Sequence, residues 1–432
     1  MAQQAPRTRL EQRAQGAHLS VREFVDRFHA AAIECGEDVH ISERQAKRWL
    51  AGVADLPRPV CRRVLEHWWA ESVSRLLGPP DGGLVTVPMN EEELIVNAGR
   101  ESVKHAIKAA SALDPSALEH LHDAAGRAAR AYYVVPPLVM FTDLVRLRDT
   151  VYEQIDRTHK PRQQAELYLL AGLVCGLLSS VSWDLGHPEV SEEQARAAHT
   201  YGSVIDHPSM CAWARALQAT VMFWTGRPRR AASLASTALE NSPVGTARAR
   251  LHSVLARSLA LVGARQEVRA ALDAAVDELQ RAGDDPFLDE IGGELGFDYS
   301  RRALCAGASF IALGDGERAE TEATAALALF GEIPESTRWA AGELGARVDL
   351  AAARTLRGDL AGAEDALVPV FVLDPERRTE AVARRLTNLG RVLGAARFRN
   401  AVEANRIGEA IEGFTAGGLP RGAARAIISN SG

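Results

Sequence analysis

The sequence contains few cysteines and no cluster of residues with the spacing of metal ligands. Its 432 residues include five widely spaced cysteines and no CxxC pair: Cys35, Cys61, Cys175, Cys211 and Cys305. Because the number of cysteines is odd and their spacing is wide, we expect free thiols in a reducing cytoplasm rather than disulfides. The nearest approach to a metal pattern is His120-Leu-His122-Asp123. Histidines two positions apart point to different sides of a helix, so we expect solvated side chains there and no bound metal.

Catalytic signatures and membrane-spanning runs are missing too. The chain has no GxGxxG, GxxxxGK[ST], GxSxG or HExxH motif, so we expect neither an enzyme nor a cofactor. A hydrolase with an unrecognised site would need convergent carboxylates that the sequence does not reveal. No uninterrupted apolar run approaches the length of about 18 residues that spans a membrane. The N-terminus also lacks the apolar core of a secretory signal, which predicts a cytoplasmic protein that contacts no membrane.

An excess of positive charge is also lacking. The net charge is −6, which argues against a general nucleic-acid binder. The charge is uneven, because residues 1–78 hold 12 Lys or Arg against 10 Asp or Glu, a net +2, and the remainder therefore carries −8. Any affinity for DNA must come from a local patch and from dimerisation. A chain of 432 residues, 47% of them apolar, predicts two or three domains with ample core material.

A short amphipathic helix within Ile41–Val53 is the most informative segment. Ser42 can cap its start, with Gln45 completing a capping box, and Gly52 can end it. The apolar residues recur at i, i+3 and i+4 and form one face: Ala46, Trp49 and Leu50. Such a helix has an apolar back for packing and leaves its other side free for a partner.

The other side of that helix is polar and basic. Arg and Lys can pair with guanine edges, Gln with adenine, and both cations with phosphate. The candidate DNA-binding residues are therefore Ser42, Arg44, Gln45, Lys47 and Arg48. The simpler alternative is an ordinary amphipathic surface helix with solvated charges. We expect the nearby tryptophans to pack in a small core rather than to stack on bases: Trp49, Trp68 and Trp69.

Composition divides the chain into six segments. Residues 1–18 are polar and predict a flexible tail, and the Pro- and Gly-rich run at 78–83 marks a linker. The expected order is the tail (1–18), a helix-turn-helix domain (19–78), a linker (79–90), a helical connecting region (91–160), divergent repeats (161–415) and a second tail (416–432).

Turn glycines and small residues recur through the last large segment. We expect each of five glycines, 40, 37, 51 and 44 residues apart, to end the first helix of a pair: Gly186, Gly226, Gly263, Gly314 and Gly358. Small residues after these turns let the two helices of a pair approach closely, which is typical of divergent tetratricopeptide repeats. No window alternates with period two. The sequence therefore predicts an all-α protein, a small helix-turn-helix bundle followed by a tetratricopeptide-like α-solenoid.

Several segments together resemble a large actinobacterial family of cytoplasmic regulators, which join an XRE-like helix-turn-helix to C-terminal tetratricopeptide-like repeats. They lie in the same order along nearly the whole chain: Ser42-Glu-Arg-Gln-Ala-Lys-Arg-Trp-Leu, Pro59-Val-Cys-Arg-Arg-Val-Leu, Leu167-Tyr-Leu-Leu-Ala-Gly-Leu, Trp183-Asp-Leu-Gly186, Gly292-Gly-Glu-Leu-Gly-Phe-Asp298, Leu313-Gly-Asp and Asp374-Pro-Glu-Arg-Arg-Thr-Glu380. Members of the family negatively regulate differentiation and antibiotic production in filamentous bacteria. The resemblance therefore implies a DNA-binding repressor.

One feature departs from the usual helix-turn-helix. Many such motifs join two short helices through a turn of three or four residues. Here six residues, 36–41, separate a long helix from the candidate recognition helix. Two hypotheses follow. The chain is either a sequence-specific regulator of double-stranded DNA or a scaffold with a degenerate helix-turn-helix that binds partner proteins only.

The repeat segment is the expected place for dimerisation and for sensing. A repeat array presents a concave groove lined by the first helix of each pair. Asparagine there can bind a peptide backbone, and arginine a carboxylate. The candidate groove residues are Trp213, Thr220, Phe223, Trp339, Arg384 and Asn388. The ligand itself, whether peptide, small molecule or protein, is not readable from these residues. Because one small domain covers only a few base pairs, we expect a homodimer.

Overall fold

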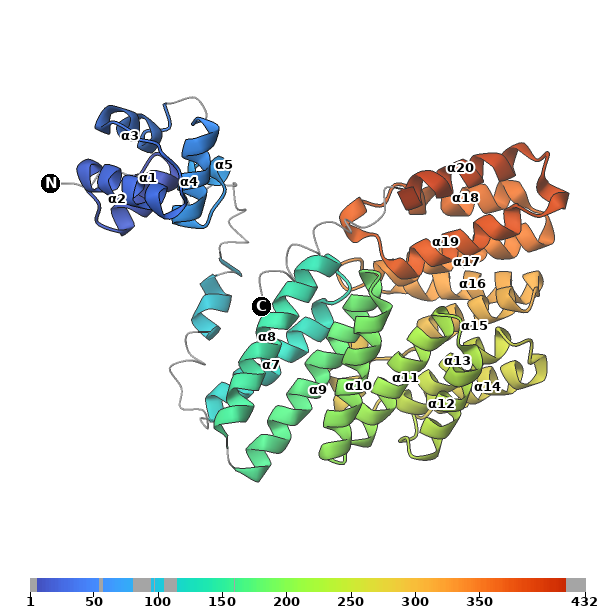
Figure 1. Ribbon diagram of the computed structural model, residues 1–432. Coiled ribbons are helices and arrows are strands. Elements are labelled where there is room, and N and C mark those ends of the chain that lie inside the picture. The colour runs from blue at the N-terminus through green and yellow to red at the C-terminus, as the bar shows by residue number, and fades with distance from the viewer. Residues whose placement is uncertain are drawn as a thin grey trace. The chain divides into compact units, whose positions relative to one another are not determined.

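The computed structural model describes residues 6–53, 57–80, 95–96, 98–104, 115–158 and 160–416 (Figure 1). Chain contacts divide the protein into two compact units, residues 1–100 and residues 101–432. Every regular element in the described ranges is a helix, and none is a strand. This confirms the predicted all-α class.

Unit 1 is a small bundle around one apolar core. Phe24 and Phe28 lie at its centre, and the rings of Phe28 and Trp49 are 5.8 Å apart. Trp68 packs on Phe24 at 5.0 Å, as expected for a core tryptophan. The described helices up to residue 80 are α1 (Arg9–Gly16), α2 (Val21–Glu34), α3 (Glu43–Leu50), α4 (Pro59–Trp69) and α5 (Val73–Leu76).

The N-terminal segment is part of this bundle, and the prediction of a flexible tail over residues 1–18 is wrong from Thr8 onward. Leu10 is fully buried in the core of unit 1. The Thr8 hydroxyl donates to the carbonyl of Leu50 at 2.7 Å, and Arg9 pairs with Glu71. These partners lie 42 and 62 residues away, so local sequence gave no sign of the anchoring.

Two other predicted boundaries can be compared only in part. Most of the predicted linker, from 81 to 90, and nearly all of the predicted C-terminal tail, from 417 to 432, lie outside the described residues. The described part of the predicted connecting region, 91–160, has helical residues at 95–96 and 98–104, and it contains α7 (Pro115–Ala131) and α8 (Pro137–Arg157), which pack against α9 (Pro161–Asp184). Their apolar residues belong to the same core as the helices that follow.

The rest of unit 2 is a succession of helix pairs. Proline at the first turn begins α8 to α12, a position where its missing N–H costs nothing. The helices are α10 (Pro188–Val204), α11 (Pro208–Trp224), α12 (Pro228–Glu240), α13 (Thr246–Ala260), α14 (Arg265–Leu279), α15 (Tyr299–Ala312), α16 (Gly316–Glu332), α17 (Ala340–Arg357), α18 (Leu360–Phe371), α19 (Glu380–Leu393) and α20 (Val402–Ala416).

The five predicted turn glycines each follow the end of a first helix. They come after α9, α11, α13, α15 and α17, with φ between +71° and +88°, a region that favours glycine. The first helices contact one another in sequence, from α9 to α11, α13, α15, α17 and α19. α19 also contacts α9, so the row of first helices closes on itself.

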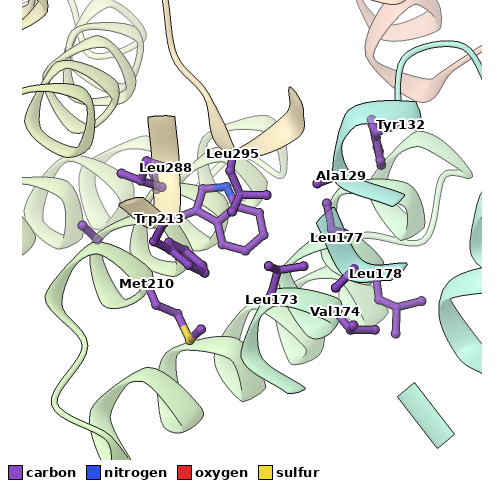
Figure 2. Packing of buried hydrophobic residues seen from close by; sticks show 14 of the residues in the cluster. Ala129, Tyr132, Leu173, Val174, Leu177, Leu178, Met210, Trp213, Leu288 and Leu295 are labelled. Atoms are coloured by element: carbon purple, nitrogen blue, oxygen red, sulfur yellow. The ribbon is translucent and has the colours of Figure 1, made fainter. Parts of the chain in front are cut away.

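The longest first helix, α9, is the centre of the unit 2 core. Its length and apolar composition would suffice to span a membrane, but 78% of the most apolar window is buried within the protein. At Gly176 an added Cβ would lie 2.1 Å from the ring of Trp213, so the indole packs directly on the α9 backbone. Figure 2 shows Trp213 among Leu173, Leu288 and Leu295. α9 is therefore a buried core helix.

Candidate functional site

The candidate recognition helix forms where the sequence predicts, with the Ser42 cap but without the side-chain bond from Gln45 that would complete a capping box. The Ser42 hydroxyl accepts a hydrogen bond from the backbone N–H of Gln45 at 3.2 Å, which caps α3. At the other end, the N–H groups of Gly52 and Val53 donate to the carbonyls of Trp49 and Arg48, both at 3.1 Å. This is a Schellman arrangement, and Gly52 takes φ +66° within it. Both ends of the short helix are thus fixed by local bonds.

The apolar face of α3 is the part of the helix that unit 1 buries. Ala46 is fully buried, Trp49 is 2% exposed and Leu50 is 8% exposed. All three belong to the unit 1 core, together with Ile41, which precedes the cap. The orientation of α3 about its own axis is therefore set by its apolar residues.

The opposite face of α3 carries three exposed cations. Arg44, Lys47 and Arg48 occupy positions i, i+3 and i+4, so their side chains share one side of the helix. None of them forms a hydrogen bond or an ion pair within the described part of the chain. Ser42 is also exposed and Gln45 is half-buried. The exposure pattern is the one predicted, and the basic face is left available to an anionic partner.

The long connection between α2 and α3 is ordered by bonds to its neighbours. The N–H of Ile41 donates to Nε2 of His29 on α2 at 3.0 Å. Glu37 accepts from Arg63 on α4 at 2.6 Å, and this contact lowers the pKa of Glu37. Gly36 begins the connection at φ +70°. The longer connection is therefore tied to both α2 and α4, and α3 itself packs on α2.

A second candidate site is a cavity enclosed by the first helices of unit 2. It has a volume of about 160 Å³. Its wall is formed by side chains from α9, α11, α13, α15 and α19, by the segment 294–297 and by Trp339 before α17. These elements span more than 200 residues of sequence, so the cavity exists only because the row of first helices closes on itself.

One wall of the cavity is a glycine-rich loop held by two arginines. Arg301 donates to the carbonyl of Gly293 at 3.1 Å, and Arg250 to those of Leu295 and Gly296 at 2.8 and 2.7 Å. Gly293 has φ +58°, and an added Cβ would meet the backbone of Ala129 at 2.2 Å. The loop therefore folds inward at a position where only glycine fits.

Two buried carboxyl groups face the same cavity. Asp184 accepts a hydrogen bond from the Tyr132 hydroxyl at 2.7 Å, and burial raises the pKa of Asp184 to about 7. Glu294 accepts from the Ser180 hydroxyl at 2.9 Å, and burial raises its pKa as well. Burial thus disfavours the charged form of both groups, although Glu294 also pairs with Arg301 at 3.5 Å.

The remaining two arginines of the cavity differ in their partners. Arg385 donates to both carboxylate oxygens of Asp349, at 3.2 and 3.3 Å. Arg257 lies over the rings of Phe223 and Trp224, with its guanidinium carbon 4.5 and 4.8 Å from their centres. Within the described chain, Arg257 has no hydrogen-bond or carboxylate partner. Burial and the neighbouring charge of Arg385 lower the pKa of Arg257 to about 10.

The structure divides the six predicted groove residues. Three of them line the cavity: Thr220, Phe223 and Trp339. Of the other three, Trp213 is buried in the core, so its prediction as a groove residue is wrong, whereas Arg384 and Asn388 lie on α19 but are not among the residues that line this cavity.

Each of these three has another role. Trp213 is 1% exposed in the core beneath Gly176. Arg384 pairs with Glu380 at 2.7 Å and donates to the carbonyl of Trp224 at 2.8 Å, which ties α19 to α11. Asn388 is exposed and accepts from Arg391.

The charged residues of the cavity were missed from sequence. A signal does exist on α13, where Arg250, Val254 and Arg257 stand at i, i+4 and i+7 and so share one face of an alanine-rich helix. Burying an arginine charge on the inward face of a first helix costs free energy unless a partner compensates the charge, so this pattern indicates a candidate site. No protein-family model matches the chain, and no curated protein is significantly similar to it.

Proposed function

We propose that the protein is a transcriptional regulator that binds double-stranded DNA through unit 1 and senses a ligand through unit 2. In this proposal unit 1 is an XRE-like helix-turn-helix domain whose recognition helix is α3. Unit 2 is a tetratricopeptide-like domain that also dimerises. The observation that carries the proposal is the face of α3, where Arg44, Lys47 and Arg48 are exposed, adjacent and without a partner in the described chain.

Electrostatics support DNA as the partner of that face. A helix with an apolar back and a cationic front fits the major groove, where Arg and Lys reach guanine edges and phosphates. Because the whole chain has a net charge of −6, the attraction is confined to this local patch. Specific binding therefore needs a second copy, whose α3 would read a half-site about 34–36 Å away.

The runner-up is a scaffold that binds proteins only, and one observation favours it. Eight residues separate α2 from α3 in the structure, from Cys35 to Ser42, which is longer than a tight helix-turn-helix turn. A scaffold would leave the basic face of α3 merely solvated.

Selection from a pool of random-sequence duplexes separates the two functions. The full-length protein is incubated with the pool, and the bound DNA is amplified and sequenced over several rounds. We expect enrichment of a defined sequence, with two half-sites related by twofold symmetry. A scaffold would enrich nothing. Light scattering in the same buffer should give the mass of a dimer.

A further inference from the structure

The strongest unexplained feature of unit 2 is the guanidinium of Arg257. It lines the cavity and lies over the rings of Phe223 and Trp224, and its side chain forms no hydrogen bond or ion pair within the described chain. The carboxylate of Asp349 acts on it electrostatically, but that carboxylate is already hydrogen-bonded to Arg385. A half-buried charge with no hydrogen-bonding partner of its own costs stability. The three other arginines of the cavity, Arg250, Arg301 and Arg385, all donate to protein oxygens.

We propose that the cavity binds a small monocarboxylate with a ring-sized apolar body, whose carboxylate pairs with Arg257. This inference deepens the sensing role given to unit 2 above and rests on that proposal for the effect on DNA, while the binding itself stands on the cavity alone. The two edges of a carboxylate match the planar fork of a guanidinium.

The volume of the cavity sets the size of the ligand. About 160 Å³ is close to the roughly 150 Å³ of an engineered apolar cavity that accommodates benzene. One ring or a short branched chain fits this space. The apolar part of the wall that would contact such a body includes Val254, Phe297 and Leu304.

The charges around the cavity favour one negative charge on the ligand rather than two. A single arginine is free, and the carboxyl groups of Asp184 and Glu294 face the same space. A phosphate dianion would be repelled by these groups whenever they ionise, and a neutral ligand would leave Arg257 unpaired. A monocarboxylate satisfies Arg257 without adding a second charge.

Isothermal titration of the full-length protein, without DNA, tests the site directly. The probes are benzoate, phenylacetate and cyclohexanecarboxylate, with benzamide as the neutral isostere and inorganic phosphate as a plain anion. We expect at least one of the three carboxylates to bind with one site per chain. Benzamide should bind at least about tenfold more weakly, since it carries no negative charge to pair with Arg257 and its NH2 group cannot accept the second hydrogen bond of the guanidinium. Phosphate should neither bind measurably nor displace the carboxylate.

Variants at position 257 assign the binding to this residue. Arg257→Gln should weaken the carboxylate at least about tenfold while leaving the affinity for benzamide unchanged. Arg230→Gln removes an exposed charge from the outer helix α12 and is the matched control, which should bind as the wild type does. Without ligand, Arg257→Gln should melt at nearly the same temperature as the wild type or slightly below it, because its side chain loses cation–π contacts with Phe223 and Trp224 but no ion pair.

Three results would overturn the proposal. They are the failure of all three carboxylates to bind the wild type, equal carboxylate affinity in Arg257→Gln, and phosphate binding as tight as that of the carboxylates. A melting temperature of Arg257→Gln well below that of the wild type would also overturn it, because Arg257 would then be a structural residue. The titration contains no DNA, so its outcome is independent of the DNA selection. Carboxylate binding together with a failed DNA selection would refute the proposed regulator but not the proposed carboxylate site.

Discussion

The carboxyl group of Asp184 gives unit 2 a predictable dependence on pH. Its ordinary pKa of 3.8 is raised by burial to about 7 in the folded protein. Between these two values the unfolded chain loses the proton while the folded protein keeps it. Stability therefore falls as pH rises through this window, because the folded state binds more protons than the unfolded state. Above a pH of about 7 the whole cost is present.

The size of the effect follows from the two pKa values. Their difference corresponds to about 4 kcal/mol at most, and about 3 kcal/mol of it develops between pH 5 and pH 8. Asp184→Asn removes the ionisation and can still accept the hydrogen bond from Tyr132. The stability gained by this substitution should therefore be larger at pH 8 than at pH 5, by as much as about 3 kcal/mol.

Urea denaturation of the full chain at the two pH values measures this difference. Hydrogen exchange in peptides from α9 and α11 assigns the change to unit 2. Asp365→Asn, which replaces an exposed carboxylate on α18, is the control. Its effect on the free energy of unfolding should not increase between pH 5 and pH 8. If Asp184→Asn changes the free energy of unfolding equally at both pH values, the carboxyl is not protonated in the folded protein and the reasoning is refuted.

Two further substitutions test the packing of each unit. Glu71 accepts from Arg9 at 2.8 Å and from Arg13 at 3.0 Å, and these contacts lower its pKa to about 2. Glu71→Gln should therefore destabilise unit 1 by about 1–3 kcal/mol at pH 7, as measured by urea titration. The loss should become progressively smaller as pH falls from about 4.5 towards 2, because Glu71 is then protonated in the wild type. Gly176→Ala should cost unit 2 about 1–3 kcal/mol by calorimetry, because its Cβ would overlap Trp213, whereas Gly408→Ala on α20 meets nothing within 4 Å and should stabilise by about 0.5–1 kcal/mol. A gain at Gly176 would contradict the packing of α9 on Trp213.

Features that depend on nearby residues were predictable from the sequence. The cap at Ser42, the stop at Gly52 and the helix-ending glycines each need only contacts a few residues apart. The buried and exposed faces of α3 followed from the 3.6-residue period alone. For the same reason Trp49 and Trp68 were correctly expected in the core.

Features that depend on tertiary closure were not predictable. α1 is anchored through Glu71, 62 residues from Arg9, and no local pattern indicates this pair. Asn388 shares a face of α19 with the cavity-lining Ala381 and Arg385, yet it is exposed and not among the residues that line the cavity. The cavity arginines are brought together by the contacts of α19 with α9 and α11. These contacts join helices far apart in the sequence, so they cannot be predicted by examining one helix at a time.

The central claim, sequence-specific binding of DNA by α3, is tested most directly by fluorescence anisotropy on the selected duplex. The wild type is compared with an Arg44→Ala/Arg48→Ala variant and with Arg22→Ala/Arg27→Ala, which removes the same charge from exposed positions on α2.

We expect the α3 variant to lose about 1–3 kcal/mol of binding free energy per substitution and most of its preference over a scrambled duplex. The α2 variant should bind more weakly to both duplexes, keep the preference and flatten the salt dependence. Equal affinity of the wild type and the α3 variant for the selected duplex would contradict the account.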